Sequence, residues 1–225
     1  MGLILNLETS STNCSVCIAK DGVILALKEL NSANYSHAEK LHVFIEEVIK
    51  EAAIKLEDLD AIAVSKGPGS YTGLRIGVSA AKGLCYALDI PLISVSTLKS
   101  MAAQLDIIND EAIIIPVLDA RRMEVYSAVF DNQLQQIRET KAEIIDEQSF
   151  EKYISSNSVH FLGSGAEKIK GVFNNDNLIF HLDVVPSAKE MAPISSYKFK
   201  NKDFEDVAYF EPYYLKDFVL QTKRK

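Results

Sequence analysis

Cysteine is scarce in this sequence, and its number is odd. Cys14, Cys17 and Cys85 cannot all pair within one chain, which excludes a complete disulfide framework. Cys14 and Cys17 have the C-x-x-C spacing found in many zinc sites, but a second such pair is missing from the sequence. We therefore expect buried free thiols, as is usual in a reducing cytoplasm, and no zinc site.

Basic residues and long apolar runs are also lacking. The chain has 24 Lys and Arg against 31 Asp and Glu, a net charge of −7. An acidic chain repels a phosphate backbone, so we do not expect it to grip nucleic acid by itself. No charge-free apolar run reaches the ~18 residues that a membrane-spanning helix needs, and the N-terminus enters a predicted strand within two residues. We expect a cytoplasmic protein that does not contact the membrane.

What the sequence does contain is the pattern of an ordinary folded protein, with 48% hydrophobic and 24% charged residues. Apolar periodicity predicts a strand and helix order of β-β-β-α-β-α-β up to residue 95, with a short helix following. Lys20-Asp21-Gly22 is a strong hairpin signal within it. The predicted strands are 3–7, 14–19, 23–30, 61–64 and 91–95, and the predicted helices are 36–53, 72–88 and about 96–105.

After residue 109 the same order begins again, although the two halves have dissimilar sequences. The predicted strands are 113–118, 124–130, 134–139, 159–162 and 178–184, with helices at 146–154, after Gly165 and at about 187–200. Strand–helix alternation in each half predicts an α/β fold with mixed sheets covered by helices. We expect an N-terminal lobe at 1–108 and a smaller, degenerate lobe at 109–225, whose last segment can pack back on the first.

The stretch SKGPGSYTGLRIGVSAAKGL, residues 65–84, has the glycine-rich loop and helix of a phosphate-binding site. It does not match the known patterns. The Walker A motif needs G-x-x-x-x-G-K-[ST], whereas here five residues separate Gly67 from Gly73. The dinucleotide fingerprint needs closer glycines, and Pro68 removes one amide donor. The loop is therefore not assigned to a nucleotide by its motif.

The helix after this loop has an unusual stripe of small residues, in which Gly73, Gly77 and Ala81 recur every four positions. Each interior glycine costs about 1 kcal/mol relative to alanine, and close approach of another backbone can offset this. The stripe predicts either tight packing on the chain's own sheet or an outward face that meets another protein; we favour the second. Arg75 opposes the helix dipole in the first turn, so it needs either an anionic neighbour or solvent.

Four segments together resemble the TsaB family. They are ILNLETSSTNCSVCI (4–18), SHAEKLH (36–42), GPGSYTGLRIGVSAAKGL (67–84) and LDARRMEVYSAVF (118–130). The likeness runs from residue 3 to about residue 130. It thins beyond that point, where FLGSGAEK (161–168) and EPYYLK (211–216) are similar to later segments of that family.

The resemblance implies two actin-like (ribonuclease-H-like) βββαβα lobes and a role in making threonylcarbamoyladenosine at position 37 of tRNA. It implies a non-catalytic scaffold that binds and activates the larger transferase TsaD as a heterodimer, together with the ATPase TsaE. It further implies a homodimer in the absence of TsaD, and only indirect contact with tRNA. The residues that the resemblance places at the partner interface are Ser36, His37, Leu41, Tyr71, Thr72, Leu74, Arg75, Gly77, Val78 and Ala81.

Catalytic constellations are not evident in the sequence. The H-x-x-x-H pair that holds a metal in TsaD falls here on Thr97 and Met101, which do not replace it. His37 and His42 are five positions apart, so they do not share a helix face, and we expect both to be solvated. His160 and His181 flank predicted strands without a companion carboxylate or cysteine cluster. A metallopeptidase is therefore disfavoured, and no catalytic residue or metal ligand is predicted.

Whether the chain binds a nucleotide is harder to decide from the sequence. The residues that form a degenerate nucleotide loop are Glu8, Thr9, Ser10, Ser11, Gly67 and Gly69. Glu8 stands where actin-like ATPases usually keep an aspartate, and Asp119 with Arg121 could form either a vestigial phosphate loop or a salt-bridged turn. We expect no cofactor, although weak binding of ATP or ADP stays open. The alternative function is a small-molecule or sugar-kinase-like phosphotransferase of the same fold.

Overall fold

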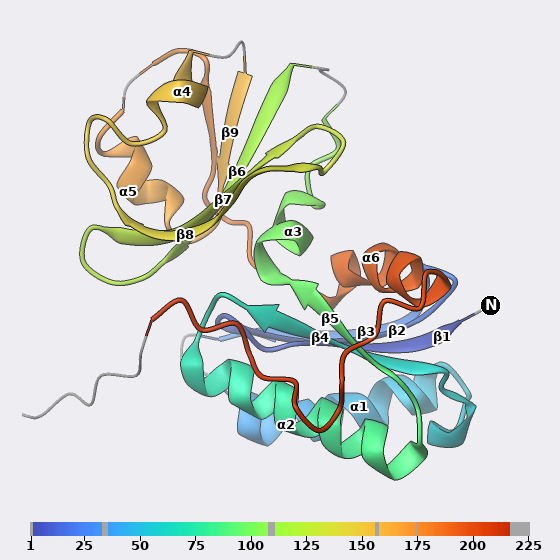
Figure 1. The fold of residues 1–225 in the computed structure, drawn as a ribbon. Coiled ribbons are helices and arrows are strands. Elements are labelled where there is room, and N and C mark those ends of the chain that lie inside the picture. Colours follow the sequence, from blue (N-terminus) through green and yellow to red (C-terminus); the bar gives the residue numbers. More distant parts are fainter. Residues whose placement is uncertain (1, 33–35, 108–110, 156–157, 174, 217–225) are drawn as a thin grey trace, which may run out of the picture.

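The computed structural model describes residues 2–32, 36–107, 111–155, 158–173 and 175–216. Within these ranges the chain forms two five-stranded sheets, one above the other in Figure 1. The expected lobe boundary after residue 108 lies outside the described residues. Among the described residues, no helix is both long enough and apolar enough to cross a membrane.

The first sheet has the strand order β3-β2-β1-β4-β5. Its strands are β1 (Leu3–Glu8), β2 (Asn13–Lys20), β3 (Val23–Asn31), β4 (Ala61–Gly67) and β5 (Leu92–Ser96). β1, β2 and β3 pair antiparallel, whereas β4 and β5 continue the sheet in parallel. Asp21 and Gly22 both have positive φ, as the predicted hairpin between β2 and β3 requires.

The second sheet repeats this order, reading β8-β7-β6-β9-β10. Its strands are β6 (Ala112–Asp119), β7 (Glu124–Asp131), β8 (Gln136–Ile144), β9 (Ser158–Leu162) and β10 (Leu178–His181). The α/β class, the mixed sheets and the topological repeat predicted from the sequence are confirmed.

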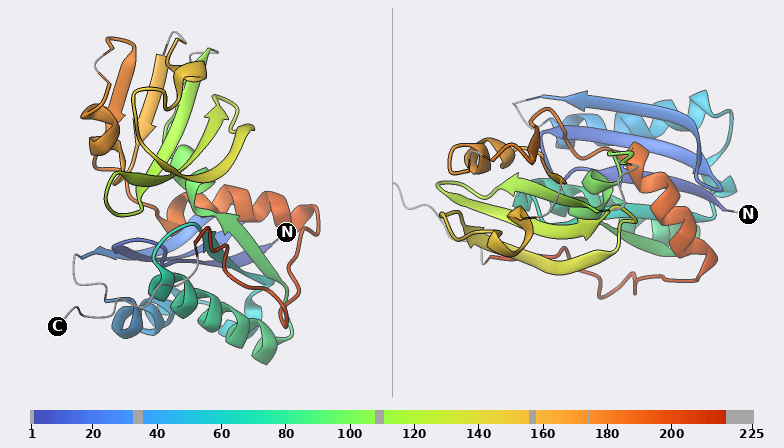
Figure 2. Two further views of the ribbon diagram at one scale, coloured as in Figure 1. Left: turned by 60° about the vertical axis from the view of Figure 1, so that its left-hand side comes forward. Right: turned by 90° about the horizontal axis from the view of Figure 1, so that it is seen from above.

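Helices cover both faces of the first sheet (Figure 2). On one face, α1 (His37–Glu51) and α2 (Tyr71–Leu88) bury a core with the strands, next to a short 3-10 helix η1 (Leu56–Asp58). On the other face lies α6 (Ala188–Lys200), whose residues Ala188, Met191 and Ala192 are buried against β1, β2 and β5. Helix α6 therefore covers the first sheet, although it follows the second sheet in sequence.

The second sheet packs α5 (Ala166–Lys170) and the short α4 (Glu151–Ile154) on one face. On its other face, α3 (Thr97–Ala102) lies between the two sheets (Figure 1) and shares a buried cluster with Ile114, Leu118 and Leu162. α4 is shorter than the predicted helix 146–154, because Asp146 accepts hydrogen bonds from the amide of Gln148 and the hydroxyl of Ser149, which favours a turn over a helix.

Candidate functional site: the glycine-rich loop and the face of helix α2

The glycine-rich loop leaves β4 at Gly67, which has a φ of +107°, and enters α2 within four residues. Ser70 is the N-cap, and its hydroxyl accepts a hydrogen bond from the Gly73 amide at 3.3 Å. The predicted sharp turn that starts a helix is therefore present. The three cysteines predicted as free thiols are buried and unpaired with one another.

Gly73 and Gly77 of α2 face inward, onto the connection between β1 and β2. The Ser70 amide donates to the Ser10 carbonyl at 2.7 Å, and the Thr9 hydroxyl donates to the Gly73 carbonyl at 2.8 Å. A Cβ atom on Gly73 would lie 2.0 Å from the Thr9 carbonyl oxygen, and one on Gly77 would lie 2.3 Å from the Thr9 hydroxyl oxygen. These glycines allow the helix and the connection to touch.

The expectation that the stripe of Gly73, Gly77 and Ala81 points outward is therefore wrong. Gly73 and Gly77 are buried on the inner side of α2, and Ala81 is fully buried in the core of the first sheet. The physical reason is the bulk of the β1–β2 connection, which would not fit beneath a helix with larger side chains on that face.

Most of the predicted interface residues are buried within the chain. Within the predicted set, the residues that are buried in the chain's own core are His37, Leu41, Leu74, Gly77, Val78 and Ala81. Ser36 and Tyr71 are half-buried, and Thr72 and Arg75 are exposed. His37 was expected to be solvated; instead its Nε2 lies 2.7 Å from the Ser11 carbonyl oxygen, and burial lowers its pKa.

The opposite side of α2 is exposed, and the sequence prediction included two of its residues, Thr72 and Arg75, but missed the others. The open face of α2 consists of Thr72, Arg75, Ser79, Gly83, Tyr86 and Ala87. A Cβ atom on Gly83 would meet nothing within 4 Å, and Tyr86 is 86% exposed. The signal was available, because Ser79, Gly83 and Tyr86 recur at helical spacing on the side away from Leu74, Val78 and Ala81.

Glu8 lies at the end of β1 and is completely buried. Its Oε1 accepts a hydrogen bond from the Ser10 amide at 2.6 Å, and within the described residues its Oε2 has no partner. Burial raises the pKa of the Glu8 carboxyl above its ordinary value, although hydrogen bonds from neighbouring residues oppose that rise. A carboxyl held inward in this way is not presented to a metal ion or a phosphate.

The other members of the predicted nucleotide loop also serve internal contacts. Thr9 and Ser10 are buried, and a Cβ atom on Gly69 would lie 2.3 Å from the Ser10 carbonyl oxygen. Ser11 is half-buried, and its carbonyl is the partner of His37. The Thr9 hydroxyl and the Ser10 amide are bonded within the protein, and the Ser10 hydroxyl is buried, so these groups are not presented to a phosphate and do not fit a bound nucleotide.

The remaining sequence candidates are structural. Asp119 pairs with Lys168 at 2.8 Å and accepts from the Arg121 amide at 2.6 Å, so the salt-bridged turn is correct. Thr97 and Met101 are buried, and the Met101 methyl carbon would lie 2.3 Å from a Cβ atom on Gly163. Among the described residues, no group of three or more His, Cys, Asp and Glu side chains could hold a metal ion.

A C-terminal strap, residues 205–216, lies along β5 and the start of α2. The Glu205 amide donates to the Leu92 carbonyl at 2.8 Å, and the Tyr213 amide donates to the Lys66 carbonyl at 2.7 Å. Lys82 on α2 donates to the carbonyls of Ala208 and Phe210 at 3.0 and 2.9 Å. The strap is thus fixed through its backbone, leaving most of its aromatic rings at the surface.

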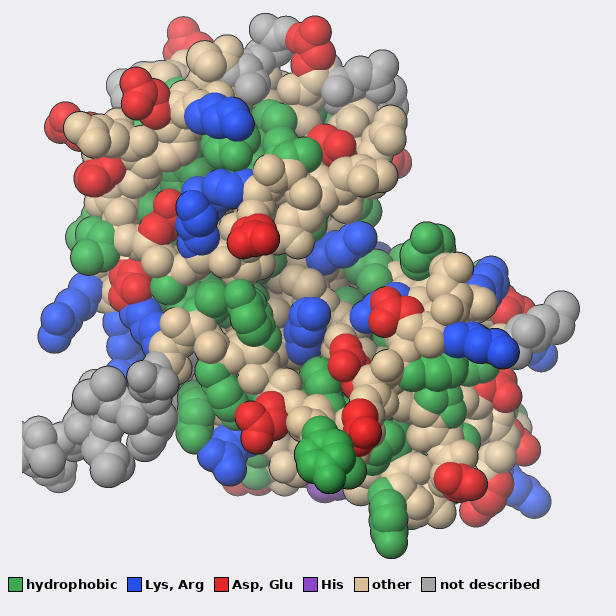
Figure 3. Space-filling model, in the orientation of Figure 1, with side chains coloured by type: hydrophobic (Ala, Val, Ile, Leu, Met, Phe, Trp, Pro, Cys, Tyr) green, Lys and Arg blue, Asp and Glu red, His purple; other side chains and the backbone are tan. Residues whose placement is uncertain are grey.

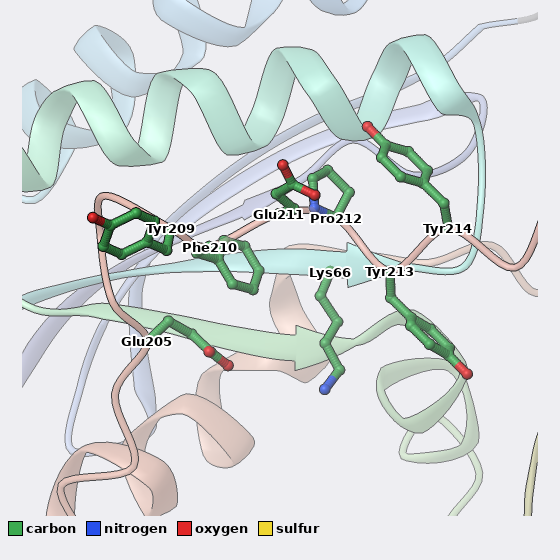
Figure 4. A pocket seen from close by; sticks show the side chains of 8 residues that line it. All are labelled: Lys66, Glu205, Tyr209, Phe210, Glu211, Pro212, Tyr213 and Tyr214. Carbon is green, nitrogen blue, oxygen red and sulfur yellow. The ribbon is translucent and has the colours of Figure 1, made fainter. Parts of the chain in front are cut away.

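The strap borders an open depression of about 560 Å³ beside β4 (Figure 4). It is lined by Lys66, Glu205, Tyr209, Phe210, Glu211, Pro212, Tyr213 and Tyr214. Tyr214 turns towards the start of α2, where its ring lies 5.0 Å from that of Tyr71 between centroids. The guanidinium of Arg75 donates to the Tyr71 hydroxyl at 2.6 Å, so this cation has a neutral partner within its own chain.

The sequence of this chain is similar to those of known tRNA-modification proteins. A family model described as TsaD, tRNA N6-adenosine threonylcarbamoyltransferase, matches residues 31–222. The TsaB protein of Escherichia coli is 31% identical over 229 residues, covering 98% of this chain and 97% of that protein. A threonylcarbamoyltransferase of Bacillus thuringiensis is 38% identical, but over only 41% of this chain and 32% of its own length.

The solved structures support the fold. The structure of YeaZ from Pseudomonas aeruginosa superposes with a TM-score of 0.82 and 22% identity, covering 96% of this chain and all of that one. The match extends over both sheets, so the two-lobed actin-like architecture implied by the resemblance is confirmed. Together with the near full-length likeness to TsaB and the match to the transferase model, this places the chain in the TsaB family of tRNA threonylcarbamoyladenosine biosynthesis proteins.

Proposed function

We propose that this chain is a non-catalytic scaffold subunit, which binds and activates the threonylcarbamoyltransferase TsaD together with the ATPase TsaE. The observation that carries the proposal is the open face of α2, which is exposed on the outer side of the first sheet, away from the second sheet (Figure 2). The family membership supplies the reaction, which is threonylcarbamoylation of tRNA adenosine 37.

The surface has the composition that helix packing needs. Ser79, Gly83 and Ala87 are small and exposed, so the backbone of a second helix can approach α2 closely. Gly83 is disfavoured in a helix by about 1 kcal/mol relative to alanine, and no contact within the described residues of this chain offsets that cost. A helix of a partner protein that packed closely against Gly83 would offset this cost.

Helix α1 lies beside α2 on the same face of the sheet and extends the surface. Its exposed residues include Ala38, His42, Val43, Glu46 and Glu47, of which Val43 is 45% exposed. Tyr86 on α2 offers a large exposed ring of the kind that is enriched at the centres of interfaces. We infer that a pair of helices from TsaD packs across α1 and α2.

The chain's own chemistry supports a scaffold over the kinase-like alternative. The Glu8 carboxyl and the Ser10 hydroxyl are buried, and the Thr9 hydroxyl and the Ser10 amide are bonded within the chain, so these groups are not exposed to a ligand. Activity in the complex would then reside in TsaD, with tRNA touching this chain only indirectly. In the absence of TsaD, we expect the same helical face to form a homodimer in the cytoplasm.

The test replaces Gly83 with arginine, which improves helix propensity but fills the open face. We expect Gly83→Arg to fold, to lose at least tenfold in affinity for TsaD in calorimetric titration, and to lose stimulation of threonylcarbamoyl transfer. Gly171→Arg, at an exposed glycine beside α5, is the matched control and should bind as the wild type does. Undiminished binding by Gly83→Arg would overturn the proposed interface.

A second arm separates the scaffold from an enzyme. Glu8→Gln keeps the shape of the buried side chain and removes its ionisable group. We expect the reconstituted set of this chain, TsaD and TsaE to transfer threonylcarbamoyl at the wild-type rate with this variant. A loss of several hundredfold, which is typical when a catalytic group is removed, would show that Glu8 takes part in the transfer and that this chain is not merely a scaffold.

A further inference from the structure

Two histidines of the second sheet form a side-chain pair that the proposed function does not use. His160 lies on β9 and His181 ends the neighbouring parallel strand β10. The Nδ1 of His160 lies 3.0 Å from the Nε2 of His181, and the Nε2 of His160 lies 2.9 Å from the Ser158 hydroxyl oxygen. The sequence separates these residues, so the reasoning from sequence treated them one by one.

The ring geometry describes a hydrogen bond along the line that joins the two rings. The rings are inclined by only 12° and their centroids are 5.3 Å apart, which is about the separation of coplanar imidazoles joined end to end by a 3.0 Å bond. The lone pair of one nitrogen thus points at the N–H of the other. A metal ion would need both lone pairs to converge on a point beside that line, so the geometry favours proton sharing over chelation.

This arrangement limits how many protons the pair can hold. When both rings are neutral, one nitrogen of the facing pair donates and the other accepts, and the Ser158 hydroxyl can either donate or accept. One added proton is accommodated, because the second nitrogen of His160 can then donate to Ser158. A second added proton would place an N–H on both facing nitrogens, only 3.0 Å apart and on two cations.

The surroundings offer little to stabilise two charges. On the same face of the sheet, the register neighbours of His160 are Ile114 on β6 and Ile179 on β10. α5, which carries Glu167, Lys168 and Lys170, packs on the opposite face with Phe161 and Ile169. Within the described residues, the charge that acts on His160 is that of His181 itself.

We propose that the hydrogen-bonded pair of His160 and His181 is a pH-sensitive contact between β9 and β10. The contact holds while the pair carries at most one added proton, and it opens when the pair binds a second proton. Because His181 ends β10, opening this contact also affects the segment that follows the strand. The His181 carbonyl accepts from the Gly163 amide at 3.1 Å, and a few residues further the Val185 carbonyl accepts from the Gln104 side chain at 2.7 Å. Opening the end of β10 loosens the connection that leads to α6 and the first sheet.

The direction of the effect follows from the folded state. Burial lowers the pKa of both rings below the ordinary value of about 6.5, and for His160 the charge of His181 lowers it further. The unfolded chain therefore binds more protons than the folded chain as the pH falls below about 6.5. The contribution to stability is complete above that pH and is lost as the pH falls through the lower pKa values of the folded protein.

The proposal is tested on the full chain by NMR titration of its four histidine rings. In the wild type we expect one ring of the pair to take up a proton before the other, in two separated steps. In His181→Gln, His160 should titrate in one step and at a higher pH. Independent titration of both wild-type rings near pH ~6.5 would overturn the proposal, and this result does not depend on whether the variant folds.

Hydrogen exchange of residues 178–187 provides the second readout. Between pH 7.5 and pH 5.5, after correction for intrinsic rates, we expect local opening in the wild type to rise by up to about tenfold for each histidine of the pair, because pH 5.5 lies about one unit below the ordinary pKa of about 6.5. The response should flatten in His181→Gln and stay unchanged in His42→Gln, whose ring is exposed on α1. His37, which is also buried, lies in the first half and does not affect this local signal directly. If hydrogen exchange responded to pH identically in the wild type and in His181→Gln, the proposed pH-sensitive contact would be contradicted.

Discussion

Gly73 and Gly83 lie in the same helix, but they meet different surroundings. Gly73 is pressed against the Thr9 carbonyl, where a Cβ atom would lie 2.0 Å from a backbone oxygen, whereas a Cβ atom on Gly83 meets nothing within 4 Å. Only the first glycine is required by the packing of this chain. The second is a cost of about 1 kcal/mol that the isolated subunit carries.

This difference predicts opposite effects of the same substitution. Gly73→Ala should destabilise the chain by about 1–3 kcal/mol, since the β1–β2 connection must shift to admit the methyl group. Gly83→Ala should stabilise it by up to about 1 kcal/mol through helix propensity. Urea unfolding followed by circular dichroism measures both, and stabilisation by Gly73→Ala would show that the helix does not touch Thr9 in solution.

At the scale of elements, α2 has a buried side and an exposed side, and hydrophobic periodicity identified only where the helix lies. The start at Ser70, the end near Leu88 and the strand before it all follow from local patterns. Which side faces the core depends on the β1–β2 connection, a neighbour sixty residues away in sequence whose closeness no local pattern reports. Small residues on both sides made the outward and inward readings equally consistent with the sequence.

The strap shows a second limit of local reasoning. Residues 204–216 lack regular secondary structure, as the sequence predicted, but their position depends on backbone carbonyls that meet Lys82. Val207 and Phe210 contribute apolar contacts to the core beneath α2. On this side of the molecule, hydrophobic side chains are interspersed with charged ones at the surface (Figure 3). A sequence pattern cannot predict such an attachment because any backbone carbonyl can accept from lysine.

Lys82→Met tests the attachment, since methionine keeps the length and helix propensity of the side chain without its donor. We expect residues 205–213 to become more sensitive to limited proteolysis, because two carbonyls lose their partner at about 1 kcal/mol each. The unfolding midpoint should fall by only a few degrees, because about 2 kcal/mol of hydrogen bonding is lost while Val207 and Phe210 still pack on the core. Lys50→Met, at the exposed end of α1, is the control. Equal cleavage of both variants would mean that Lys82 does not hold the strap.

At the scale of the whole molecule, the two sheets are joined through a shared core rather than by a flexible connection. Helix α3 follows β5 of the first sheet, yet Leu98, Met101 and Ala102 are buried with Ile114, Phe130 and Leu162 of the second. The last helix, α6, returns from the second sheet to the first. The repeat was predictable because each half carries its own strand–helix order, whereas this joint depends on contacts between halves.

The shared core predicts that the described fold unfolds as one cooperative unit despite its two sheets. Met101 is fully buried, with its methyl group packed against Gly163, so Met101→Ala should cost about 2–5 kcal/mol through lost contacts and a cavity at the joint. We expect scanning calorimetry to show one transition for the wild type, and a lowered midpoint with a broadened or divided transition for the variant.

Met123→Ala is the control. Its side chain is 45% exposed in the second half, so this substitution should change the free energy of unfolding by no more than about 0.5 kcal/mol. If Met101→Ala kept a single transition at the wild-type midpoint, the joint would not be what couples the two sheets, because removing its central side chain must weaken any coupling that depends on it.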